Sequence, residues 1–188
     1  MKRVVLLAVV PVMGFLAQGL FAQGRGGPVS MNADLNQKYN AIKTNLTKAA
    51  EDMPEDGYSL QPSKEERNFG AWVAHVADSQ AGGCSGIAGA RKNIGAASKT
   101  SKADLVAALK ESFDICDAVY SGTTEANMNE MVASFGGQTP RAAALYGTLI
   151  HDNECYGNMA VYLRLKGIVP PSTEAMQAGR GARGGRGR

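Results

Sequence analysis

The chain has 188 residues, with 20 lysines and arginines against 17 aspartates and glutamates, so its formal net charge is +3. Without Lys2, Arg3 and the four arginines of residues 180–188, 14 basic residues remain against 17 acidic ones. A mildly acidic fold excludes a basic face that would bind nucleic acid specifically. The length is that of one domain after both ends are set aside.

The N-terminal segment has the pattern of a secretory signal peptide. The basic pair Lys2 and Arg3 precedes an apolar run over residues 4–21, and cleavage is expected after Ala22. A transmembrane anchor is the alternative, but Pro11 interrupts the run and no stop-transfer pattern follows. We therefore expect residues 1–22 to be removed, leaving a secreted or periplasmic protein without a stable membrane anchor.

Glycine and arginine dominate both ends of the expected mature chain. Residues 23–31 are predicted to form a flexible N-terminal segment, and residues 174–188 a disordered Gly/Arg-rich tail. Neither segment has enough apolar side chains to order itself by burial. The tail is interpreted as a solvated extension that helps solubility or binds loosely to anionic surfaces, with nucleic-acid binding as the weaker alternative. The domain itself is expected over residues 32–173.

The first half of this domain contains two helical patterns. The first covers residues 32–51, and its apolar stripe consists of Leu35, Tyr39, Ile42 and Leu46. Ser63 and Glu66 have the spacing of a capping box, which predicts a second helix from residue 64 or 65 to residue 91.

Two further helical patterns follow in the second half. Ser101 is a suitable N-cap for a third helix over residues 102–120. Residues 123–137 are interpreted as a loop with a short helical turn, and no convincing strand pair is visible. Thr139 and Pro140 are typical of an N-cap and first helical residue, which predicts a fourth helix ending at residue 165 or 166. Four helices with short links predict an all-α four-helix bundle.

Two helices also carry candidate metal ligands. His151 and Cys155 are four residues apart and share one helix face, while His75, the other histidine of the chain, falls at the edge of the second helix's apolar stripe. The alternative is that both histidines are hydrogen-bonded structural residues and that Cys155 is a small buried hydrophobe. A Cys155–His151 nucleophile and base pair is a weaker interpretation of the same residues.

The fourth helix also places Asp152 inside its apolar stripe, together with Tyr156. A buried carboxylate needs a partner. It either orients a ligating histidine or pairs with a buried arginine or tyrosine. A c-type haem bundle is excluded because the sequence lacks C-x-x-C-H, and a di-iron bundle because it lacks paired Glu-x-x-His motifs.

Three segments carry a resemblance to a known family. Residues 69–78 (FGAWVAHVAD), 151–158 (HDNECYGN) and 162–171 (YLRLKGIVPP) resemble the DinB family of four-helix-bundle proteins, and the likeness covers residues 32–173. The resemblance implies an up-down-down-up order of helices. It also implies one divalent metal ion, often nickel or zinc, held by three histidines.

The expected ligand set departs from that family pattern at one position. His75 and His151 match two of the three histidines, but the third position is Cys155. A thiolate ligand favours zinc over nickel, whereas a protonated or oxidised cysteine would leave two ligands and weak binding. Asp152 and Tyr156 are expected to contact these ligands on the side away from the metal and to orient them.

The implied helix order also bears on the three cysteines. When the second and third helices run parallel, Cys84 and Cys116 lie at the same level, so the resemblance implies a Cys84–Cys116 disulfide that leaves Cys155 free. Two unpaired core thiols are the alternative.

Characterised relatives of the family include transferases and isomerases that use small thiol cofactors. The first functional hypothesis is therefore an exported metalloenzyme of thiol-dependent transferase or hydrolase type, acting on an unidentified small molecule. The second is a non-catalytic bundle with a degenerate metal site, which binds a ligand or a partner, for example as a homodimer.

Overall fold

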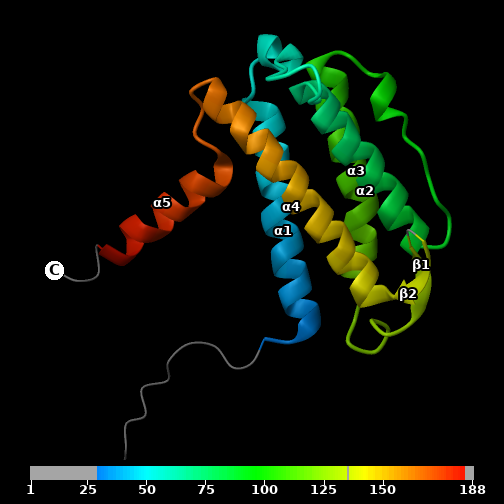
Figure 1. Ribbon diagram of the computed structural model, residues 1–188. Helices are drawn as coiled ribbons and strands as arrows, with labels where there is room; N and C mark the ends of the chain where they lie inside the picture. The colour runs from blue at the N-terminus through cyan, green and yellow to red at the C-terminus, as the bar shows by residue number, and fades with distance from the viewer. Residues whose placement is uncertain (1–28, 135, 185–188) are drawn as a thin grey trace, which may run out of the picture.

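Helices account for most of the chain in the computed structural model, which describes residues 29–134 and 136–184 (Figure 1). The helices are α1 (Met31–Asp52), α2 (Phe69–Ile87), α3 (Lys102–Ser121), α4 (Arg141–Leu165) and α5 (Pro171–Gly184), and the strands are β1 (Met131–Ser134) and β2 (Gly137–Pro140). Short 3₁₀ helices lie at Glu55–Ser59 and Ala96–Ser98. The segments expected to be a signal peptide and a flexible N-terminal linker lie outside the described residues, apart from residues 29–31.

Contacts between helix ends establish the order of the bundle. Near the starts of α1 and α4, the Tyr146 hydroxyl donates to Asp34 at 2.7 Å, so these helices run parallel. The start of α3 meets the end of α1, where Lys102 Nζ donates to the carbonyl of Met53 at 2.7 Å. A disulfide joins the C-terminal parts of α2 and α3, which are therefore also parallel. The prediction of an all-α bundle with up-down-down-up topology is confirmed.

Apolar stripes of α1 to α4 form one core. The four residues predicted to point inward from the first helix are at most 2% exposed. Tyr39 of α1 stacks on Tyr120 of α3 with ring centroids 3.8 Å apart, and the Tyr120 hydroxyl donates to the carbonyl of Leu145 in α4. The tyrosine rings thus fill the centre of the core, while their hydroxyl groups form hydrogen bonds.

The start of α2 differs from the prediction. The helix begins at Phe69, because the side chain of Asn68 accepts from the backbone N–H of Ala71 at 2.7 Å and caps it there. Ser63 and Glu66, which have capping-box spacing, instead form a turn in which Glu66 N–H donates to the carbonyl of Ser63. Spacing alone did not distinguish a turn from a helix start.

A β-hairpin occupies the segment that was predicted to be a loop with a helical turn. Strands β1 and β2 pair antiparallel, with Met131 opposite Pro140 and Ser134 opposite Gly137. The turn needs positive φ, which Gly136 (90°) and Gly137 (141°) supply. Pro140 is consequently the N-cap residue of α4 rather than its first helical residue. The hairpin packs against α2 and α4, next to the candidate site.

The C-terminal region also differs from the prediction. α4 ends at Leu165, as predicted, and Gly167 follows it in the left-handed conformation with φ of 73°. The chain then forms α5, where an unstructured tail was expected from residue 174, and this helix projects from the bundle (Figure 1). Glu174, in the first turn of α5, accepts a hydrogen bond from Lys48 Nζ of α1 at 3.0 Å. A carboxylate near a helix N-terminus also stabilises the helix through its dipole. Within the described part of the chain, no helix is both long and apolar enough to cross a bilayer.

Candidate metal centre

His75 of α2 and His151 of α4 face each other across the seam between these helices. Their Nε2 atoms lie 3.0 Å apart, and their ring planes are inclined by 62°. At this distance the two nitrogens can share one hydrogen-bonding proton, or both can present lone pairs to one ion. The antiparallel course of α2 and α4 therefore brings together two residues that are 76 positions apart.

Cys155 adds a sulfur one helical turn beyond His151. Its Sγ lies 3.7 Å from His151 Nε2, and the ligand atoms of His75, His151 and Cys155 all lie within 4.8 Å of one another. Cys155 is 2% exposed, whereas the side chain of His151 is 36% exposed. The sulfur thus lies on the core side of the cluster, and the structure brings together all three candidate ligands.

Asp152 lies behind His151 and is fully buried. Its Oδ1 is 3.6 Å from Nδ1 of His151 and has no hydrogen-bond partner. Interaction with Asp152, and then with Cys155, raises the pKa of His151, while burial raises the pKa of the Asp152 carboxyl. When the His151 ring is neutral, a carboxylate in this place favours the tautomer with its proton on Nδ1, which leaves the Nε2 lone pair facing the other two candidate ligand atoms.

His75 has a different environment on α2. The edge of Trp72 packs against its ring at a centroid distance of 5.9 Å, and the Arg67 guanidinium lies over the face of Trp72. Burial, and then the positive charge of Arg67, lower the pKa of His75. His75 is therefore neutral at neutral pH, which is the form that binds a metal ion.

An open groove of about 590 Å³ leads to the two histidines, which both line it. Its walls consist largely of small residues from α2, α4 and the β-hairpin, including Gly82, Gly83, Gly86, Gly147 and Ala133. A Cβ atom added at Gly86 or Gly147 would meet no atom within 4 Å. Because these glycines have no side chain, a molecule has room to approach the candidate ligands from solvent.

Comparison with known proteins identifies the family. A family model described as the DinB superfamily matches residues 39–157, which is more than half of the chain. The chain belongs to the DinB superfamily. No curated protein matches it.

Two solved structures support the fold of this DinB superfamily member. The crystal structure of a DinB-like protein from Bacillus cereus ATCC 10987 superposes with a TM-score of 0.63 at 18% identity, covering 73% of this chain and 93% of that one. A DinB-like protein from Bacillus subtilis gives a TM-score of 0.57 at 18% identity, covering 71% and 92%. At these identities the likeness establishes the fold alone.

Two of the three separations between candidate ligand atoms are close to those of a tetrahedral zinc site. With Zn–N near 2.05 Å and Zn–S near 2.3 Å, tetrahedral ligands lie about 3.3 Å apart for N···N and about 3.6 Å for N···S. The corresponding distances are 3.0 Å between the two Nε2 atoms and 3.7 Å between His151 Nε2 and Cys155 Sγ. The buried Oδ1 of Asp152, without a hydrogen-bond partner, provides the carboxylate that such sites place behind a histidine.

Tyr156 does not join this cluster. Its hydroxyl donates to Oγ of Ser172 and accepts from the Ser172 backbone N–H, both at 2.9 Å. Tyr156 is five residues beyond His151, and five residues turn a helix by about 140°, so the ring points toward the start of α5. It joins α4 to α5 rather than supporting the ligands.

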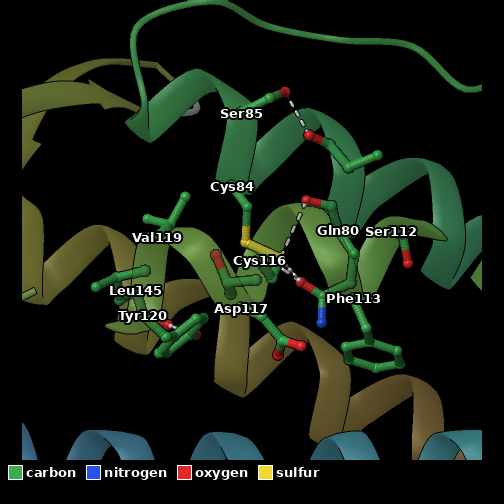
Figure 2. The surroundings of a disulfide bond; sticks show 12 residues. Gln80, Cys84, Ser85, Ser112, Phe113, Cys116, Asp117, Val119, Tyr120 and Leu145 are labelled. Atoms are coloured by element: carbon green, nitrogen blue, oxygen red, sulfur yellow. Dashed lines mark hydrogen bonds between the residues drawn. A yellow bond between two sulfur atoms is a disulfide. The ribbon is translucent and has the colours of Figure 1, made fainter. Parts of the chain in front are cut away.

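Cys84 and Cys116 form a disulfide between α2 and α3, with Cα atoms 5.1 Å apart (Figure 2). Cys155 is free. Beside the disulfide lies Gln80, a fully buried residue of α2 to which the sequence analysis assigned no role. In the sequence, Gln80 stands out as a polar residue among apolar ones on the buried face of its helix, as Asp152 does on α4. The structure shows that these two buried residues bond each other.

Proposed function

We propose that this protein is an exported DinB superfamily member that binds one divalent metal ion, preferably zinc, through His75, His151 and Cys155. The observation that carries the proposal is the convergence of three ligand atoms within 4.8 Å from two helices. The resemblance to three-histidine metal proteins supports the location. The cysteine in the third position supports zinc, because a thiolate suits this metal better than nickel.

A metalloenzyme is the activity that this arrangement supports best. Zinc held by three protein ligands supplies Lewis-acid chemistry to a substrate group at the remaining position. The groove gives a substrate access to that position, and Ser79 and Thr148 line it with polar side chains next to the histidines. We infer a reaction of hydrolase or thiol-dependent transferase type on a small molecule.

Metal analysis of protein purified without a histidine tag tests this proposal. We expect one zinc ion per chain, and its loss in the His151→Ala variant. Asn153→Ala is the matched control, because Asn153 is an exposed residue of α4 outside the ligand set and should leave the zinc content unchanged. A site that stays empty after incubation with zinc and nickel would overturn the proposal in favour of a non-catalytic ligand- or partner-binding module.

Export is supported by two independent features. Residues 1–22 have the composition of a signal peptide, and a buried disulfide is typical of oxidising compartments. N-terminal sequencing of the protein recovered outside the cytoplasm is expected to begin at Gln23. Recovery of a cytoplasmic protein with residues 1–22 intact would contradict export.

A further inference from the structure

Gln80 connects the disulfide to the candidate metal centre through buried contacts. Its side chain and that of Asp152 are both 0% exposed, and its Nε2 donates a hydrogen bond to Oδ2 of Asp152. The other oxygen of Asp152 is the one that lies 3.6 Å from Nδ1 of His151. Two successive contacts therefore link Gln80 of α2 to His151, a candidate metal ligand on α4.

The opposite end of the Gln80 amide lies against the disulfide (Figure 2). Oε1 is 2.9 Å from Sγ of Cys116 and 3.7 Å from Sγ of Cys84. Bonded sulfurs carry no S–H, so they limit the movement of Oε1 by contact rather than by donating a hydrogen bond. Because Oε1 lies against the sulfurs, the amide is held in the orientation in which Nε2 faces Asp152.

We propose that Gln80 is a positioning residue of the metal centre, held by the Cys84–Cys116 disulfide on one side and holding Asp152 on the other. This inference rests on the proposed metal binding by His75, His151 and Cys155. A buried carboxylate that loses its donor leaves an unpaired acceptor, so Asp152 would have to reorient toward another partner. That reorientation changes its position relative to His151.

The main test replaces Gln80 with leucine, which keeps nearly the same volume and removes the amide. Because changes behind metal ligands cost about 10- to 100-fold in metal affinity, we expect zinc to bind about tenfold or more weakly in competition with a chelator. Cobalt substitution should give a changed ligand-field spectrum, which a merely structural role would not produce. Ser112→Ala is the control, since its buried hydroxyl bonds the Leu109 carbonyl and does not contact Asp152.

A second variant leaves Gln80 and Asp152 intact. The double change Cys84→Ala/Cys116→Ala removes the sulfurs that contact the amide, and we expect a loss of zinc affinity that is smaller than that of Gln80→Leu. Wild-type affinity and an unchanged cobalt spectrum in both folded variants would overturn the inference.

A metal-free measurement separates this inference from the proposed function. In ¹H–¹⁵N spectra, we expect wild-type His151 to carry a ring proton on Nδ1. We expect the ring signals of His151 to shift in Gln80→Leu, while the backbone amide signals of the exposed residues of α4 stay in place. If the wild type binds no metal, the proposed function fails while this shift still reports on Gln80. Unshifted His151 signals in Gln80→Leu would overturn the positioning role even when zinc binds.

Discussion

Two polar clusters cross helix seams in this bundle, and they differ in how fully their atoms are paired. Between α1 and α3, Asp117 accepts from the Tyr39 hydroxyl at 2.7 Å and from Lys43 Nζ at 2.6 Å. Between α2 and α4, Asp152 has one oxygen without a hydrogen-bond partner, and three ligand atoms converge beside it. The first cluster uses its own donors and acceptors to join helices, whereas the second keeps lone pairs available, as a binding site does.

The largest expected effect comes from Cys155. Replacing it with alanine removes one of three ligands, and we expect zinc affinity to fall on the order of 100-fold or more in a chelator competition assay. Cys155→His supplies the third histidine that the family resemblance implies, so it should retain metal binding and shift preference toward nickel. Wild-type zinc affinity in Cys155→Ala would show that the sulfur is not a ligand.

Zinc itself should stabilise the α2–α4 cluster. A ligand that binds only the folded state adds about 2.7 kcal/mol of stability when its free concentration is 100 times Kd. Urea denaturation with and without zinc should show this gain in the wild type and lose it in His75→Ala. An equal gain in His75→Ala would place the zinc elsewhere on the protein.

Tyr39→Phe tests the α1–α3 cluster. It removes a hydroxyl that donates to the Asp117 carboxylate, and a hydrogen bond to a charged group contributes about 1.5–3 kcal/mol. We expect the free energy of unfolding to fall by this amount while zinc affinity stays the same. A parallel loss of zinc affinity would mean that the two clusters are coupled through the core.

Lys43→Ala should have the smallest effect. The lysine is 32% exposed and its partner Asp117 is 44% exposed, and ion pairs of this kind contribute about 0.2–1 kcal/mol. The loss of unfolding free energy should shrink in high salt. Lys64→Ala is the control, since Lys64 is 91% exposed and lies 3.6 Å from Glu65, so its replacement should leave stability unchanged.

The bundle was predictable because its helices have strong apolar periodicity. Leu35, Tyr39, Ile42 and Leu46 repeat on one stripe, and the burial of all four follows directly. Boundaries depended on weaker signals. α2 starts after Asn68 instead of at the Ser63–Glu66 pair, because the side chain of Asn68 makes a single capping hydrogen bond. Two glycines allow the turn of a hairpin whose strands are only four residues long.

The candidate site was predictable only in part. Helix spacing placed His151 and Cys155 on one face, but the position of His75 beside them depends on how α2 crosses α4, which was available only through the resemblance. Tyr156 was assigned to the site by its stripe, although a rotation of about 140° directs it to Ser172. Gln80 was passed over, because a polar residue on a buried face does not reveal its partner.

The disulfide also sets the order in which parts of the molecule can separate. It links α2 to α3 across 32 residues of sequence, whereas the cysteine of α4 is free. In a partial opening of the bundle, α2 and α3 stay tethered while α4 can detach, carrying His151 and Cys155 away from His75. The lifetime of a bound ion would then be set by the rate at which α4 detaches. Because the disulfide holds α2 and α3 together, detachment of α4 is the opening that would release the ion.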